Sequence, residues 1–217
     1  MQIFEGPESG PGVVTADPET VLAALEDFDV DAPWDAVRHR LIPLLPRVRP
    51  LPVPIEGLVR VMLPPGVLTG FGLDLGPAVT FVDHAQLDRW GIGVDTAIST
   101  ALANVRRMVA TCHPGTVHRS TIERTPVAIF QSRLGIASTL ILVPECIERL
   151  VGPGPHLLLA PMRDILMALP AATDRGLAAW LCAEWEAIDP NCLHLGAFRY
   201  ERGSITAEPL EEAVARA

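Results

Sequence analysis

Apolar residues recur at spacings of three and four over residues 94–110, and this pattern predicts the clearest helix of the chain. Asp95 in its first turn and Arg106 and Arg107 near its end suit the helix dipole. Asn104 lies at the edge of the apolar stripe, where a buried amide needs a hydrogen-bond partner. We therefore expect a long helix with one face in the core.

Short apolar runs bounded by proline mark the region that follows residue 155. Residues 156–160 and 165–169 flank the turn Pro161–Asp164, and runs of this length suit buried strands better than a helix. A helical pattern covers residues 173–188, and a second hairpin is predicted over 194–207. The order of these elements is hairpin, helix, hairpin.

Strands and an interrupted helix are predicted in the middle of the chain. A short helical turn covers residues 84–90, and residues 137–151 predict a helix that begins at Ser138 and that Pro144 breaks or kinks. The strand candidates are residues 58–63, 70–75 and 78–82, of which the last two face each other across Gly76-Pro77. Residues 125–136 are predicted as a strand or as a hairpin with a bend at residues 133–135.

The first 54 residues are predicted to form an appendage to a main domain at 55–217. Residues 1–16 read as a loose arm, and Asp17-Pro18-Glu19 starts a helix that runs to about residue 28. A second short helix is expected over 35–45. Prolines at four of the nine positions 46–54 exclude a helix and a central strand, so this stretch is predicted as an extended connector.

Taken together, the pattern predicts an α+β fold. We expect an antiparallel sheet, either continuous or split, packed by three main helices near residues 94–110, 138–151 and 173–188. The tail from residue 210 to 217 is predicted as a short helix.

Composition excludes several kinds of partner. The net charge of −9 argues against a nucleic-acid binder, which needs clustered positive charge. No apolar run approaches the ~20 residues that cross a bilayer, so we expect no membrane partner. The N-terminus lacks the features of a signal peptide, and a cytoplasmic location is expected. All 17 basic residues are arginine, which excludes Schiff-base chemistry and a lysine-dependent phosphate loop.

Arg163-Asp164 is the first candidate ligand site, because it lies at the turn between two buried strands. Arg163 in this place could bind a carboxylate or phosphate in bidentate fashion, oriented by Asp164. In the structural interpretation, Asp164 closes the turn through its own backbone and Arg163 is solvated. The two interpretations are both open at this point.

Asp83-His84 and Asn104 complete the candidate ligand-binding set. An Asp–His step at a strand end suits acid–base chemistry, but Asp83 could equally cap the helical turn that follows it. The candidate set is therefore Arg163, Asp164, Asn104, Asp83 and His84.

The four cysteines, Cys112, Cys146, Cys182 and Cys192, form no CxxC pair and are expected to be buried and free. Cys112, His113 and His118 are three metal-ligand residues whose spacing matches no familiar site, so no metal and no cofactor is expected. Cys192 and His194 would share one strand face and could form a thiol–imidazole pair with Cys182 nearby. We favour a buried cysteine beside a surface histidine, and we expect none of the cysteines to be a catalytic nucleophile.

Several segments between residues 80 and 208 resemble DUF1444, an uncharacterised bacterial family. The similar segments are Val79–Asp83 with Leu87 and Gly91, Ala101–Asn104, Ala137–Pro144 and Leu158–Asp164. This sequence lacks the lysine-rich surface of that family. The resemblance implies an α+β fold with an antiparallel sheet, and it implies no activity.

No common catalytic signature is present, including G-x-S-x-G, H-E-x-x-H, G-x-G-x-x-G and the P-loop. The first functional hypothesis is therefore a binding or protein-interaction module with a regulatory role, whose partner is an unknown protein or a small anionic ligand. The alternative is an enzyme of unfamiliar type, a hydrolase or a small-molecule tailoring enzyme, in which Arg163, Asp164 and a histidine converge in a pocket.

Overall fold

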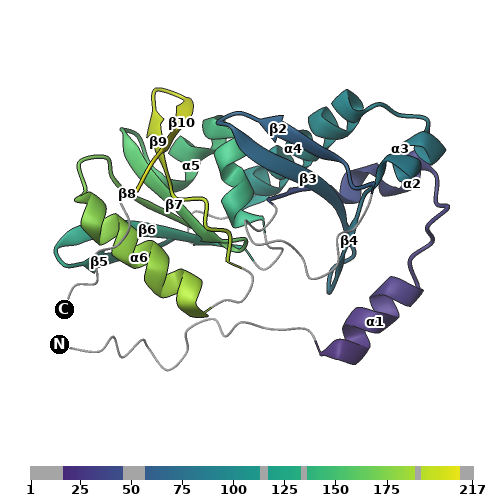
Figure 1. Cartoon of the computed structure of the whole chain (residues 1–217), viewed down its shortest axis with the longest axis horizontal. Coiled ribbons are helices and arrows are strands. Elements are labelled where there is room, and N and C mark those ends of the chain that lie inside the picture. The colour runs from purple at the N-terminus through teal and green to yellow at the C-terminus, as the bar shows by residue number, and fades with distance from the viewer. Residues whose placement is uncertain (1–16, 46–56, 113–116, 133–135, 189–191, 211–217) are drawn as a thin grey trace.

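The structure, a computed structural model, describes residues 17–45, 57–112, 117–132, 136–188 and 192–210. It contains two antiparallel sheets with helices packed against them (Figure 1), which confirms the predicted α+β fold and the split sheet. The predicted arm at 1–16, the connector at 46–54, His113 and nearly all of the predicted tail helix lie outside the described residues.

The larger sheet has six strands in the order β10-β9-β7-β8-β6-β5. Both predicted hairpins of the C-terminal region are part of it, since β7 pairs with β8 and β9 pairs with β10. The strands are β5 (Val117–Ile122), β6 (Thr125–Gln131), β7 (His156–Met162), β8 (Ile165–Pro170), β9 (Ala197–Glu201) and β10 (Ser204–Glu208).

Both faces of this sheet are covered at its centre, because successive residues of β7 and β8 enter different cores. Leu157 and Leu159 pack in the cluster that includes the apolar side of α6 (Arg175–Ile188). Leu158 and Ala160 pack in the opposite cluster with the helical segments that precede β7. A strand buried on both sides needs an uninterrupted apolar run, which explains the pattern seen in the sequence.

The smaller sheet has β3 (Val67–Asp74) at its centre, paired with β1 (Leu41–Leu44), β2 (Arg60–Leu63) and β4 (Val79–Phe81). Its inner face packs against α3 (His84–Trp90) and part of α4 (Val94–Thr111). β3 and β4 form the predicted hairpin, and Asp74 accepts a hydrogen bond from the Gly76 N–H in its turn.

The long helix α4 packs against both cores, and its observed bounds confirm the prediction. Ala97 and Ala101 in its first half belong to the core of the smaller sheet. Val105 and Val109 in its second half belong to the core beneath the larger sheet. One apolar stripe of α4 therefore packs against both sheets. Figure 1 shows α4 behind β3.

The predicted helix over residues 35–45 is wrong in its second half. The chain forms α2 (Trp34–Val37) and a 3-10 turn η1 (Arg38–Arg40), and then β1, which pairs with β3. A strand was not predicted here because the four successive buried residues of β1 give no alternating pattern. A division of the chain at residue 54 consequently cuts through the smaller sheet.

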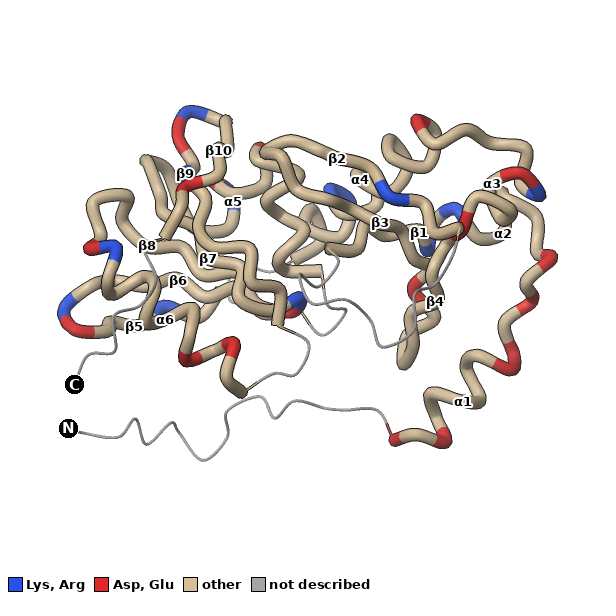
Figure 2. Tube along the Cα trace, viewed as in Figure 1, with Lys and Arg blue, Asp and Glu red and all other residues tan. Residues whose placement is uncertain are grey.

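The first helix, α1 (Pro18–Glu26), starts where the Asp17-Pro18 signal predicts, and Asp17 accepts from the Thr20 N–H at 2.9 Å. None of its residues is buried. It lies beside the rest of the molecule in Figure 1, and Figure 2 shows acidic residues along it and the segment that follows.

The segments before β6 and β7 were only partly predicted. The helix expected over 137–151 is divided at Pro144, as predicted, but its first parts are 3-10 turns: the elements are η3 (Ala137–Leu142), η4 (Pro144–Cys146) and α5 (Ile147–Val151). No element was predicted for residues 117–122, which form β5, and the tight turn between β5 and β6 places Glu123 and Arg124 at positive φ.

Candidate functional site

An open groove of about 600 Å³ lies between α4 and the α2–η1 segment. Arg38 and His39 line it on one side and Ser99, Thr100 and Arg107 on the other, with Asp35 and Ala103 completing the rim. Asn104 also lines the groove and is its one buried residue, at 3% exposure. Two arginines and one aspartate thus line the groove, in a chain whose net charge is −9.

Asn104 holds the two sides of this groove together. Its Nδ2 donates to the backbone oxygens of Arg38 and Leu41, both at 2.7 Å. Its Oδ1 accepts from Arg107 Nη2 at 2.9 Å, and the same guanidinium donates to the His39 oxygen at 3.3 Å. The partner that a buried amide needs is therefore the backbone of η1 and β1, and Asn104 supports the groove from beneath.

Asp83 and His84 lie elsewhere, where β4 leads into α3. Asp83 accepts from the Gln86 N–H at 2.7 Å and is the N-cap of α3, which confirms the structural interpretation. His84 is exposed as the first residue of this helix. Neither residue lines the groove.

Arg163 and Asp164 form the turn between β7 and β8, as predicted, but both are half-buried rather than exposed. Their backbone oxygens are engaged by neighbouring segments. Ser138 donates to the Arg163 oxygen through both its N–H and its Oγ, at 3.1 Å each. The Ser132 N–H donates to the Asp164 oxygen at 2.9 Å, so the turn is fixed by the chain on both sides of residues 133–135.

A thiol, an imidazole and a carboxylate lie next to one another in space, where the end of α6 meets the segment before β9. Cys192 Sγ is 2.9 Å from His194 Nε2, and His194 Nδ1 is 2.7 Å from Glu186 Oε2. The Leu193 N–H donates to the Pro161 oxygen at 2.8 Å, which holds this segment against the end of β7. Because the two imidazole nitrogens face different partners, the three groups form a relay.

The three groups of this relay differ in exposure. Cys192 is 9% exposed, and the side chains of His194 and Glu186 are exposed by 33% and 15%. His194 has a positive φ of 50°, a conformation that is uncommon for residues other than glycine. Cys182 lies one turn before Glu186 on α6. Burial and then the Glu186 charge raise the pKa of its thiol to about 12.

Chemically, the groove and the relay are different kinds of site. The groove offers hydrogen-bond donors with positive charge, which suit an anion. The relay offers a nucleophile with a base. No group of three histidine, cysteine or acidic residues is placed to hold a metal ion within the described parts of the chain, and His113 lies outside them.

None of the helices in the described part of the chain combines the length and the apolar character that crossing a membrane requires. Comparisons with family models, curated proteins and solved structures found no match to this chain. The resemblance to DUF1444 therefore stays a prediction.

The five residues of the candidate set do not gather in one place. Asn104 lies in the groove, Asp83 and His84 start α3 beside the smaller sheet, and Arg163 and Asp164 belong to the larger sheet. The sequence reasoning missed Arg38, Arg107 and Glu186. Arg38 follows Val37 in a short helical segment where nothing local marks it, and Arg107 was interpreted only as a basic residue near the end of the long helix. Glu186 could have been found only by placing the end of α6 next to residue 194.

Proposed function

We propose that this chain is a binding module with a regulatory role, and that it holds a small anionic ligand in the groove between α4 and η1. The observation that carries the proposal is the pair of guanidinium groups, Arg38 and Arg107, on opposite sides of an open groove. Arginine presents a planar fork of donors that matches the two oxygens of a carboxylate or phosphate.

Local charge supports an anion over a cation in this groove. The lining carries two arginines and one aspartate, and Asp35 is already engaged by Arg38 at 3.4 Å. Ser99, Thr100 and His39 add neutral or titratable donors around the same space. A cationic recess in a chain of charge −9 concentrates small anions, while the surrounding negative field disfavours large polyanions.

Hydrogen bonds fix the base of the groove, so binding of a ligand does not require a flexible loop to close over it. Asn104 joins α4 to the backbone of η1 and β1, and Arg107 is held by Asn104 and by the His39 oxygen. The donors are thus fixed before a ligand arrives, which reduces the entropy lost on binding. The protein partner that the sequence also allows stays a separate prediction.

The test is calorimetric titration of the full chain with inorganic phosphate and with citrate, together with thermal melts. We expect saturable binding of at least one of the two anions and a rise in Tm as its concentration increases. Arg38→Gln should weaken that binding about tenfold or more, since a hydrogen bond between charged groups contributes roughly 1.5–3 kcal/mol. Asp35→Asn should tighten it, because the carboxylate that competes with the ligand is removed.

Arg106→Gln is the matched control, because Arg106 neighbours Arg107 on α4 but pairs with Glu145 and does not line the groove. Its affinity for the anion should equal that of the unaltered chain. Equal weakening by Arg38→Gln and Arg106→Gln would show a diffuse effect of net charge and would refute the groove. Absence of saturable binding for both anions would also refute the proposal.

A further inference from the structure

The relay at the end of α6 has the connectivity that a nucleophilic thiol needs. If Nδ1–H of His194 donates to Glu186 Oε2, then Nε2 is the unprotonated nitrogen, and it faces Cys192 Sγ at 2.9 Å. In this tautomer the imidazole can take the thiol proton while the carboxylate stabilises the imidazolium that forms. This is the division of roles between nucleophile, base and orienting group in thiol and hydroxyl acyl-transfer enzymes.

The backbone indicates that this contact is built into the fold. His194 has a φ of 50°, while its neighbour Leu193 is fully buried and hydrogen-bonded to Pro161. Residues 192–196 are not part of a strand, so the two side chains do not meet through the alternation expected from the sequence. Non-glycine residues at positive φ are enriched at functional sites, where surrounding contacts compensate for the strain.

The exposure of the three groups suits reaction with a substrate that arrives from solvent. The Glu186 side chain is 15% exposed, and the His194 side chain is 33% exposed. Cys192 lies at the edge of the core, with 9% of its surface exposed.

We infer that Cys192 is a nucleophile that accepts the acyl group of an activated ester or thioester, with His194 as its base and Glu186 orienting His194. The Cys192 sulfur forms a bond to the carbonyl carbon, and the thiol proton passes to His194 Nε2. The bond from the carbonyl carbon to the leaving oxygen or sulfur breaks, and the leaving group takes that proton. Water then cleaves the S-acyl cysteine, which releases the carboxylic acid and restores the thiol.

This assignment replaces the sequence expectation that no cysteine is a nucleophile, and it holds for Cys192 alone. Cys182 lies on the same helix as Glu186 but stays a thiol near neutral pH, because burial raises its pKa to about 12. Cys112 donates to the Met108 oxygen at 3.3 Å and is more exposed than Cys192. It serves as the internal reference, as a thiol whose described hydrogen bond is to a backbone oxygen.

The experiment measures, residue by residue, iodoacetamide alkylation of the folded full chain near neutral pH, by peptide mass spectrometry. Cys192 should react about tenfold or more faster than Cys112 despite its greater burial. His194→Asn should remove this advantage, and asparagine is chosen because it tolerates positive φ better than most residues. Circular dichroism and a thermal melt establish that each variant is folded.

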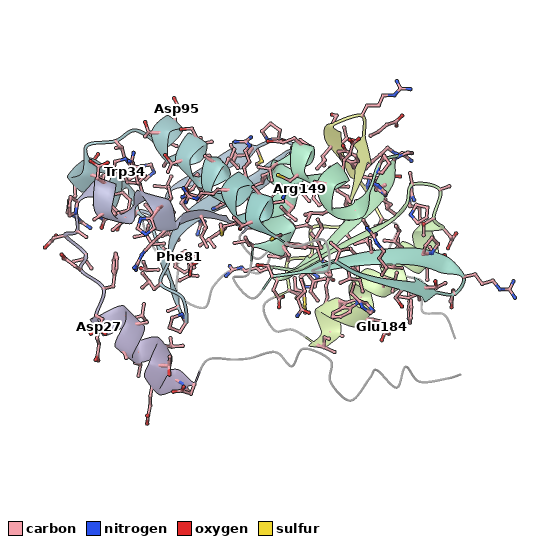
Figure 3. The ribbon with its side chains drawn as sticks, turned by 180° about the vertical axis from the view of Figure 1, so that it is seen from behind. Asp27, Trp34, Phe81, Asp95, Arg149 and Glu184 are labelled. Carbon is pink, nitrogen blue, oxygen red and sulfur yellow. The ribbon has the colours of Figure 1, made fainter. Side chains whose placement is uncertain are left out.

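The acyl step is tested with p-nitrophenyl acetate as the probe. One acetyl group per chain should appear on Cys192, with release of nitrophenolate, and Cys192→Ser should abolish both. Glu186→Gln should slow acetylation about tenfold, since it keeps a hydrogen-bond partner for Nδ1 but loses the charge that stabilises the imidazolium. Glu184→Gln, an exposed position on the same helix labelled in Figure 3, should leave the rate unchanged.

Three results would overturn the inference. One is alkylation of Cys192 no faster than that of Cys112, and another is an unchanged rate in folded His194→Asn. The third is fast alkylation without acetylation, which would show a reactive thiol that is not an acyl acceptor. The groove beside α4 shares no residue with this relay, so these results leave the anion-binding proposal untouched.

Discussion

The two sheets of this protein differ in how much of their second face is buried. The central strands of the six-stranded sheet pack on both sides, and β7 is buried along its length after His156. The four-stranded sheet packs α3 and α4 on its inner side. On its other side β1 is buried through Ile42 and Leu44, but Met62, Leu68 and Phe81 of the other strands are exposed. Figure 3 labels Phe81 in β4.

This difference indicates which region of the molecule contributes stability and which contributes binding. The six-stranded sheet is a core element, and its turn at Arg163-Asp164 is fixed by hydrogen bonds from Ser132 and Ser138. The smaller sheet is joined to the larger one through α4, and the groove lies between that helix and the α2–η1 segment that precedes β1. We expect substitutions in the first sheet to cost stability, and substitutions around the second to divide between stability and binding.

The largest difference between the sheets is expected from apolar truncations. Leu158→Ala at the centre of β7, where the side chain has no exposed surface, should lower the free energy of unfolding by about 2–5 kcal/mol. Met62→Ala in β2, 66% exposed, should change it by less than about 0.5 kcal/mol. Urea denaturation measures both. Similar losses for the two variants would contradict the exposure of the outer side of β2.

A smaller effect is expected where α4 joins the smaller sheet. Asn104→Ala removes donors to two backbone oxygens, and we expect a loss of about 1–3 kcal/mol in the free energy of unfolding. Ser99→Ala, an exposed position on the same helix, should have almost no effect on stability. Thermal melts at one protein concentration compare them. A neutral Asn104→Ala would mean that water replaces the amide at the base of the groove.

Within β3, two glycines allow the packing of the smaller sheet to be tested. A Cβ at Gly72 would lie 2.6 Å from Leu44 Cδ1 and 2.8 Å from the Thr80 oxygen, whereas at Gly70 the nearest atom is the Val59 oxygen at 3.5 Å. Gly72→Ala should therefore cost about 1–3 kcal/mol of stability. Gly70→Ala should change it by less than about 1 kcal/mol. Equal effects in urea denaturation would refute the close approach of β1 and β4 at Gly72.

The smallest effects are expected at the two aspartate helix caps. Asp83→Ala should lower stability by about 1 kcal/mol, because α3 packs on the smaller sheet. Asp17→Ala should leave global unfolding unchanged, since α1 buries no residue, and should weaken α1 alone. The Thr20 side chain lowers the pKa of Asp17 through a hydrogen bond, so its contribution is present above the unfolded pKa and is lost as pH falls through the lower folded value. NMR follows this loss as a pH-dependent shift of the Thr20 amide resonance. A resonance that does not change with pH would contradict the prediction.

The sequence prediction succeeded where local signals specify an element, namely hydrophobic periodicity and the residues that start a helix or form a turn. The stripe on α4, the Asp17-Pro18 helix start and the two hairpins of the larger sheet are local patterns, and each is observed. β1 was not predicted, because a short and fully buried strand shows no alternation of apolar and polar residues. Only its pairing with β3 distinguishes it from a helix.

The sites depended on contacts between segments distant in the sequence. The backbone oxygens that Asn104 binds lie more than 60 positions away, and Glu186 on α6 contacts His194 in the segment before β9. The sequence by itself determined the fold class and the sign of the charge, since hydrophobic periodicity and composition are properties of the chain alone. Tertiary structure decided which polar groups meet, because hydrogen bonds depend on positions in space to within a fraction of an ångström.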